Sequence, residues 1–175
     1  MIERSNKNYE DYYEIIKVID SGGYGIVYKG REKESKELRA IKVINLNKIK
    51  ENLSYELDEK DDIKEKLKSY IDNFIKEFEI MKKCCSNNNN SVKCYEYFNN
   101  EDNFTIIMEL CDKNLSQLLI DKKEEDNSYF NSEEILEIMK QLNNTFKIMI
   151  ENKIIHRNLK LENILIKYTD NNKYI

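Results

Sequence analysis

The sequence predicts an α+β fold in which a small β-sheet is followed by helices. Two observations lead to this prediction. Before residue 111, short runs rich in β-branched and aromatic residues are separated by turn residues, which is the pattern of antiparallel strands. Over 63–81 and again over 135–149, apolar residues recur at three- and four-residue steps, which is the pattern of amphipathic helices.

Length and composition fit one globular domain. The chain has 175 residues, of which 40% are hydrophobic and 35% charged, so it can bury a core. A net charge of −4 gives no basic excess that would favour nucleic acid. The sequence holds no apolar run long enough for a bilayer, and its charged N-terminus does not resemble a signal peptide. We therefore expect a cytoplasmic protein without nucleic-acid or membrane partners.

The cysteines support the same compartment. None of them forms a C-x-x-C pair, so we expect reduced thiols and no zinc site. They are Cys84, Cys85, Cys94 and Cys111.

All four glycines lie in the first predicted hairpin. Residues 14–19 and 26–31 are predicted strands, and Asp20-Ser21-Gly22-Gly23-Tyr24-Gly25 joins them. The second run continues as a strand, whereas a dinucleotide-binding turn would open a helix there. Such a hairpin either brings its backbone close to phosphate groups or is an ordinary glycine-rich turn. Asp20 stands where a G-x-G-x-x-G pattern has its first glycine, and we expect it to weaken nucleotide binding or tilt the loop.

The next predicted strand, 37–44, places Ala40, Lys42 and Ile44 on one face. A lysine on that face either extends along the surface to solvent or meets a charged partner. Glu77 lies on or beside the apolar face of the helix over 63–81, where an unpaired carboxylate is costly. We predict that Lys42 and Glu77 pair, the alternative being an exposed Glu77.

The long helix has a clear apolar stripe, and its surroundings are polar. We interpret 45–68 as an inserted, solvated helix or loop, because charged residues dominate it. Residues 87–90 are predicted to be a low-complexity loop without readable chemistry. The stripe of the helix consists of Ile63, Leu67, Tyr70, Ile71, Phe74, Phe78 and Met81.

The rest of the chain begins with a strand pair and ends in helices. Residues 92–98 and 104–110 are predicted strands, a short helix begins at 114, and 122–128 is a predicted polar loop. Asn131 or Ser132 caps the last predicted helix. The apolar stripe of that helix consists of Ile135, Ile138, Met139, Leu142, Phe146 and Met149.

One stretch near the end names a family. His156-Arg157-Asn158-Leu159-Lys160-Leu161-Glu162-Asn163 resembles the catalytic loop of protein kinases, H-R-D-L-K-x-x-N, with Asn158 in place of the catalytic aspartate. The glycine hairpin, Lys42 and Glu77 precede it in the family's order. The chain is therefore identified by resemblance as a eukaryotic protein kinase, and Lys160 indicates the serine/threonine type.

The resemblance implies a fold and its boundaries. We expect a protein-kinase-like α+β fold, with an antiparallel N-lobe sheet, the helix that the family calls αC, and the first helices of the C-lobe. Residues 1–12 would be an N-terminal extension and 13–175 an incomplete kinase domain. Within it, the N-lobe would cover about 13–110 and the partial C-lobe about 111–175.

The resemblance also implies site roles, with ATP and Mg²⁺ as cofactors. Lys42 would hold the α- and β-phosphates with Glu77 as its partner, Lys160 would meet the γ-phosphate, and Asn163 would bind Mg²⁺. Met108 would be the gatekeeper, with the Glu109 C=O and the Cys111 N–H facing adenine, and His156 would be a packing residue. The expected nucleotide contacts are Ile19, Ser21, Gly22, Gly23, Tyr24, Gly25, Val27, Ala40, Lys42, Met108, Glu109, Cys111 and Leu165.

Activity is expected to be poor, because the Asn158 amide cannot accept a proton at neutral pH. The chain also contains neither Asp-Phe-Gly nor Ala-Pro-Glu, since its glycines all lie within 22–30 and it has no proline. We expect a truncated domain with an exposed stripe around Phe146. Two hypotheses stay open: an impaired serine/threonine kinase that binds ATP and a protein substrate, or a pseudokinase that binds a partner protein as a scaffold.

Overall fold

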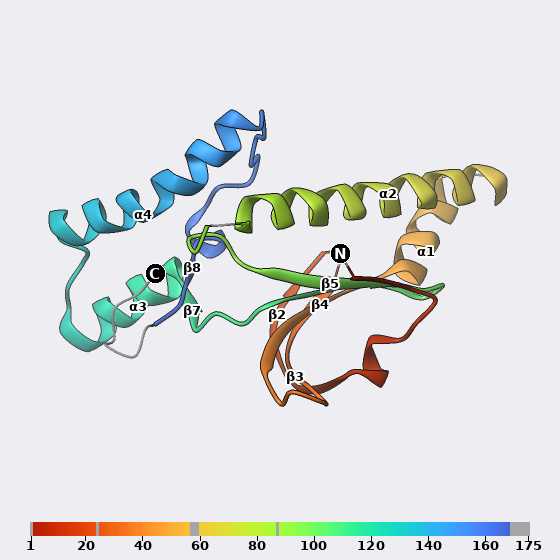
Figure 1. The fold of residues 1–175 in the computed structure, drawn as a ribbon, viewed down its shortest axis with the longest axis horizontal. Coiled ribbons are helices and arrows are strands. Elements are labelled where there is room, and N and C mark those ends of the chain that lie inside the picture. Colours follow the sequence, from red (N-terminus) through yellow and green to blue (C-terminus); the bar gives the residue numbers. More distant parts are fainter. Residues whose placement is uncertain (1, 24, 57–59, 87, 169–175) are drawn as a thin grey trace. The chain divides into compact units, whose positions relative to one another are not determined.

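The computed structural model describes residues 2–23, 25–56, 60–86 and 88–168. The chain divides into two compact units, which are described separately. The first consists of residues 1–82 and 93–110, and the second of residues 83–92 and 111–175. Figure 1 shows the strands of the first unit and the helices that follow them in the sequence.

A six-stranded sheet is the centre of the first unit. Its order is β1-β5-β6-β4-β3-β2, and β2 to β6 pair antiparallel throughout, which confirms the predicted antiparallel sheet. The strands are β1 (Ile2–Ser5), β2 (Tyr13–Gly22), β3 (Gly25–Glu32), β4 (Leu38–Asn45), β5 (Cys94–Asn99) and β6 (Asn103–Glu109).

The residues before the predicted domain also pack into this sheet. Strand β1 pairs parallel with β5, with Ile2 opposite Glu96 and Ser5 opposite Asn99. A 3-10 turn, η1 (Tyr9–Asp11), follows and buries the Tyr9 ring. The described part of 1–12 is therefore built into the first unit, which the sequence did not predict.

Two helices cover one face of the sheet. They are α1 (Leu46–Glu56) and α2 (Lys60–Cys85), and α2 confirms the predicted amphipathic helix. Phe78 of α2 is fully buried, and its ring meets Tyr97 of β5 edge-on at 5.0 Å between centroids. The other predicted stripe residues of α2 pack against the same core, because a 3.6-residue period keeps them on one side. They are Ile63, Leu67, Tyr70, Ile71, Phe74 and Met81.

The prediction of a purely solvated insertion over 45–68 is wrong for α1. Leu46, Ile49 and Leu53 are buried and belong to the core beneath α2. They recur at three- and four-residue steps, but the charged residues between them obscured that pattern. Residues 57–59 of this stretch lie outside the described residues.

The second unit is mostly helical. Leu115 and Leu118 of α3 pack with Ile138 of α4 and Ile166 of β8 in one small core. Strand β7 pairs with β8 beside this core. The elements are β7 (Lys113–Asn114), α3 (Leu115–Asp126), α4 (Ser132–Glu151), η2 (Leu161–Asn163) and β8 (Leu165–Ile166).

Helix ends in this unit differ partly from the prediction. Helix α3 continues to Asp126, so the predicted polar loop over 122–128 is wrong for most of its length. Charged residues are compatible with a helix as well as with a loop, which is why polarity alone misled. Asn131 is the cap of α4, and it forms a reciprocal capping box with Glu134.

The predicted loop over 87–90 is also more than a polar connection. Asn88 is buried, and its amide nitrogen donates to Ser91 Oγ at 2.9 Å and Thr145 Oγ1 at 3.0 Å. Its carbonyl oxygen accepts from Asn144 Nδ2 at 3.1 Å. Asn88 thus joins this loop to α4, because a buried amide needs partners for both of its ends. Asn87 lies outside the described residues.

The stripe of α4 is divided between core and solvent. Ile138 and Met149 are buried and Phe146 is half-buried, so the predicted exposed stripe around Phe146 is wrong for that part of the helix. Ile135 and Met139 are about half exposed, which confirms the prediction at the start of the helix. None of the four cysteines, which all lie within the described ranges, forms a disulfide. No helix within the described ranges combines the length and apolarity that crossing a membrane requires.

Candidate functional site

The glycine turn lies between β2 and β3, where Gly22 is opposite Gly25. A Cβ atom on Gly25 would clash with the Val43 carbonyl oxygen of β4, so this glycine is required for strand packing. A Cβ on Gly22 or Gly23 would meet nothing within 4 Å. These two glycines leave the turn backbone accessible, as a phosphate-binding loop requires. Tyr24 lies outside the described residues.

The Asp20 side chain accepts a hydrogen bond from the backbone of this turn. Its Oδ1 accepts the Ser21 N–H at 2.8 Å, so one amide of the loop is already hydrogen-bonded to a carboxylate. Both residues are exposed. The interaction places a negative charge beside the loop, which is unfavourable for an approaching phosphate.

Lys42 and Glu77 come together on the face of the sheet that α2 covers. Lys42 Nζ lies 3.9 Å from Glu77 Oε1, which is the pairing that the sequence predicts. The Glu77 side chain is 54% exposed, so the contact is a loose, solvated ion pair worth well under about 1 kcal/mol. Lys42 lies on β4, the strand that also carries Ala40, and its ammonium is not buried without a partner. The catalytic roles of both residues remain predictions.

Neighbouring strands position the other residues expected at the nucleotide. Ala40 is buried and pairs with Met108 across β4 and β6, so a small and a long side chain are adjacent in the ladder. Val27 is half-buried opposite Lys42 in the register of β3 and β4. Ile19 is 41% exposed on β2, and Glu109 ends β6 with its N–H bonded to the Lys93 carbonyl at 2.8 Å.

The opposite face of the sheet carries a cavity of about 320 Å³. Tyr28 and Val43 line it together with Gly22 and Gly25. Since Val43 and Lys42 are adjacent on β4, their side chains lie on opposite faces. This cavity is therefore distinct from the face that carries Lys42.

In the second unit, side chains of the predicted catalytic loop form hydrogen bonds with the backbone of the same loop. Asn163 Nδ2 donates to the Asn158 carbonyl at 2.7 Å, and the Asn158 N–H donates to His156 Nδ1 at 3.3 Å. Arg157 lies between them in the left-handed region, with φ of 63°. These bonds use the backbone of Asn158, so its side-chain amide is not part of them.

His156 does not pack in a core, and the prediction that it does is wrong. The residue is exposed, and its ring nitrogen instead accepts from the loop backbone. Lys160 is also exposed and precedes η2 in an extended conformation. Leu165 is 40% exposed on β8, where it pairs with Asn114 of β7. Cys111 is half-buried just before β7.

The family follows from a comparison with known proteins. The model of the protein kinase domain matches residues 13–175 of the chain. The chain belongs to the protein kinase family. Protein kinases of this family use ATP and Mg²⁺ and act on protein substrates.

Curated relatives are serine/threonine kinases. The probable serine/threonine-protein kinase fnkE of Dictyostelium discoideum is 29% identical over 177 residues, covering 99% of this chain and 12% of its own length. Calcium-dependent protein kinase 5 of Plasmodium falciparum (isolate 3D7) is 33% identical over 172 residues, covering 98% of this chain and 26% of its own length. The serine/threonine-protein kinase cds1 of Schizosaccharomyces pombe is 30% identical over 161 residues. The chain therefore spans less than a third of each of these kinases.

The residues present fit the family's cofactors. The open backbone at Gly22 and Gly23, the buried Ala40 and the Lys42 ammonium suit a nucleotide triphosphate. Asn163 offers an amide oxygen, a hard ligand that suits Mg²⁺. The described residues contain no cluster of three His, Cys, Asp or Glu side chains that could hold a metal.

The structure also contains polar contacts that the motifs did not indicate. The bond from the Ser21 N–H to Asp20 depends on turn geometry, although the aspartate itself was visible in the sequence. Asn88 had a weaker signal, because it is one of several asparagines in a row and only its burial distinguishes it.

Proposed function

We propose that this chain is an ATP-binding domain of a serine/threonine-type protein kinase whose phosphoryl transfer is impaired. The position of Lys42 supports nucleotide binding, because β4 places it opposite Val27 of the glycine hairpin and its ammonium lies 3.9 Å from the Glu77 carboxylate. Bound Mg-ATP supplies the phosphoryl group and the metal charge that offsets its oxygens. A cytoplasmic location is part of this proposal, because four cysteines without a disulfide suit a reducing compartment.

Asn158 is one of two reasons for the proposed impairment, and the lack of Asp-Phe-Gly in this sequence is the other. A kinase needs a carboxylate here to accept the proton of the substrate hydroxyl, and a carboxamide cannot do so at neutral pH. Loss of a general base lowers transfer by about 10²- to 10⁴-fold. Asp20 adds a smaller effect on binding, because its carboxylate already bonds a loop amide and repels phosphate.

Nucleotide binding is tested by thermal unfolding with ATP, with and without Mg²⁺. At 100 times the dissociation constant, binding stabilises a fold by about 2.7 kcal/mol, which raises Tm by roughly 5–10 °C for a domain of this size. We expect this shift for the natural chain, a larger shift for Asp20→Gly at the same ATP concentration, and none for Lys42→Ala.

The matched control is Lys76→Ala. Lys76 is exposed on α2 beside Glu77, and its loss removes a lysine without touching Lys42. It should retain the full Mg-ATP shift. An Mg-ATP shift that survives in Lys42→Ala would show that Lys42 does not hold the nucleotide.

Catalytic impairment is tested by Asn158→Asp. The substitution leaves the two backbone bonds of residue 158 in place, so the loop geometry should persist. We expect transfer of radiolabelled phosphate to casein to rise by about 10²- to 10⁴-fold over the natural chain. A variant that binds Mg-ATP but stays inactive would contradict Asn158 as the limiting residue.

A second function is a pseudokinase that serves as a scaffold for another protein. The observation that favours it is the exposed apolar surface of α4, where Ile135, Leu136 and Met139 are each at least half exposed. Exposed apolar groups of this size mark interaction surfaces in many proteins. Absence of both an Mg-ATP shift and revived transfer, in a folded sample, would favour this function.

A further inference from the structure

The outer edge of β5 is covered by a segment that the kinase family model does not include. The model begins at residue 13, so β5 would be the edge strand of the sheet formed by the matched residues. Edge strands expose backbone N–H and C=O groups that can pair with another extended segment. Here β1, Ile2–Ser5, pairs with that edge in parallel, and the Asn6 N–H donates to the Asn99 carbonyl at 2.8 Å.

One side chain of β1 enters the sheet as an anchor. Arg4 Nε lies 2.6 Å from Glu96 Oε2, and Glu96 is only 5% exposed. The Arg4 guanidinium also lies 4.0 Å from the centroid of the Tyr12 ring. A buried carboxylate without a counter-ion is strongly unfavourable, so the contact depends on a cation at this position. The hydrogen bond to Glu96 correspondingly raises the pKa of Arg4.

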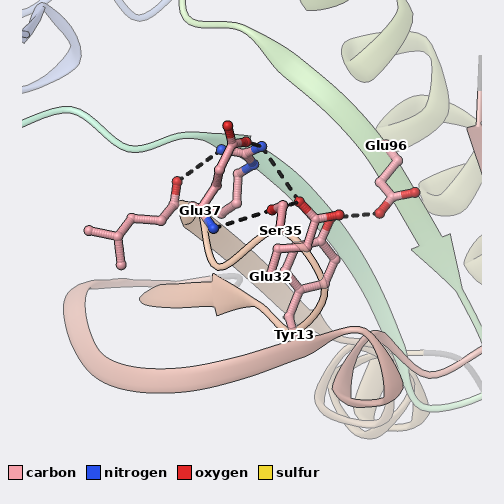
Figure 2. A network of polar contacts seen from close by, with 7 residues as sticks. Tyr13, Glu32, Ser35, Glu37 and Glu96 are labelled. Atoms are coloured by element: carbon pink, nitrogen blue, oxygen red, sulfur yellow. Dashed lines mark hydrogen bonds and ion pairs between the residues drawn. The ribbon is translucent and has the colours of Figure 1, made fainter.

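The other half of this anchor is independent of β1. The Tyr13 hydroxyl donates to Glu96 Oε1 at 2.7 Å, as Figure 2 shows. Tyr13 lies on β2 and is itself buried. Oε1 of Glu96 is thus bound by Tyr13, a residue of the matched domain, whereas Oε2 binds the arginine. Tyr13 and Glu96 form a fixed receptor for a guanidinium beside a strand edge.

The short connection after β1 would allow β1 to detach from β5 while the turn η1 stays in place. Lys7 and Asn8 are exposed, and Asn6 before them has φ of 59°, a conformation that costs a non-glycine residue energy. The following turn is held separately, because Tyr9 is buried and the Lys33 N–H donates to the Tyr12 carbonyl at 2.8 Å. Loss of β1 therefore leaves η1 with its own contacts.

We propose that the outer edge of β5 is a docking site for an extended, arginine-bearing peptide. The peptide pairs parallel with β5 and places its arginine on Glu96 Oε2, and β1 occupies this site in cis. Backbone pairing supplies affinity and the arginine supplies specificity, as in other cases where a peptide adds a strand to a sheet. This inference does not depend on nucleotide binding or on phosphoryl transfer.

The cis strand must be weakened before a free peptide can compete. A short flexible tether gives β1 an effective concentration on the order of millimolar, so the natural chain should bind a free peptide poorly. Removal of the Arg4 side chain keeps Tyr13 and Glu96 in the chain and takes away the anchor of the competitor. It also leaves the buried Glu96 without its cation, which an arginine-bearing peptide would restore. The same substitution should therefore have opposite effects in the protein and in the peptide.

The test uses the full chain and a fluorescent peptide that copies residues 1–8, with fluorescence anisotropy as the readout. The Arg4→Ala chain should bind this peptide at least tenfold tighter than the natural chain. The same peptide with alanine at position 4 should not bind either chain. Arg31→Ala is the matched control, because Arg31 forms an exposed ion pair with Glu14 at 3.8 Å, and it should behave like the natural chain.

Folding of the variants is checked by circular dichroism. Should Arg4→Ala unfold, Arg4→Lys decides, because lysine keeps a cation near Glu96 but lacks the Nε donor, and it should give a smaller gain in peptide binding. The proposal is overturned if the folded variant binds no more peptide than the natural chain. It is equally overturned if the peptide without arginine binds as well as the one that carries it.

Discussion

Gly25 and Gly23 are two positions apart, yet an added methyl group would meet different surroundings at each. On Gly25 it would overlap the carbonyl oxygen of Val43, which belongs to the neighbouring strand and cannot move freely. On Gly23 it would enter open space. The turn therefore combines one glycine needed for packing with one that only leaves its backbone uncovered.

We predict that Gly25→Ala lowers the free energy of unfolding by about 1–3 kcal/mol, because strands β3 and β4 must separate to relieve the overlap. Gly23→Ala should change it by less than about 1 kcal/mol, in either direction, because no contact is lost. Urea unfolding measures both values. Equal losses of unfolding free energy at the two positions would show that Gly25 is not needed for the close approach to Val43.

Helix α4 shows how an element is stabilised by its first turn. Glu134 accepts from the Asn131 N–H at 2.9 Å and from Lys122 Nζ of α3 at 2.7 Å. These contacts, led by the bond from Lys122, hold the pKa of Glu134 below its ordinary value. A lowered pKa means that the folded state favours the carboxylate, so its contribution is present at neutral pH and disappears as the pH falls through the folded pKa.

Glu134→Gln should therefore destabilise the chain at pH 7, by about 1 kcal/mol or less for a partly exposed ion pair. The difference from the natural chain should shrink as the pH falls through the lowered folded pKa of Glu134, because the protonated glutamate then carries no charge, as glutamine carries none. Glu133→Gln is the control, since Glu133 is exposed in the same helical turn, and it should show little effect. Denaturant unfolding at several pH values measures this difference. A difference that stays the same at every pH would show that the charge of Glu134 does not stabilise the helix.

At the scale of the whole molecule, we predict that buried tyrosines lower stability at alkaline pH. Tyr9 packs in the core on the face of the sheet opposite α1 and α2. Burial raises its pKa to about 12, with a further contribution from nearby Glu10. Burial and the bond to Glu96 likewise raise the pKa of Tyr13. The folded state retains these protons above pH 10 while the unfolded state releases them, so stability falls as the pH rises from about 10 toward the folded pKa values.

Replacing the Tyr9 hydroxyl should remove part of this pH dependence. A retained proton contributes a slope of about −1.4 kcal/mol per pH unit, so between pH 9 and 11.5 Tyr9→Phe should lose clearly less stability than the natural chain. Tyr55→Phe is the control, because Tyr55 is 89% exposed, and this variant should lose as much stability over the same range as the natural chain. Identical alkaline losses in Tyr9→Phe and the natural chain would rule out Tyr9 as a contributor.

Regular periodicity is the part of this fold that the sequence determined by itself. The stripe of α2 and the alternation along β4 predicted where Phe78 and Ala40 are buried, because the side-chain period of a helix or strand is a local property. The order of the glycine turn, Lys42 and the loop around Asn158 was enough to predict the family, which the match over residues 13–175 shows. Lys42 and Glu77 could be paired in advance from their positions beside apolar faces, although the pair is solvated and Glu77 is 54% exposed.

Only the tertiary structure decided contacts between residues whose local patterns look polar or irregular. Arg4 meets Glu96 across 92 positions, and Asn88 finds its partners on α4, although neither has a signal that separates it from a surface residue. The buried leucines of α1 and the exposed ring of His156 reversed expectations for the same reason. Burial depends on which elements pack over a position, and distant parts of the chain supply those elements.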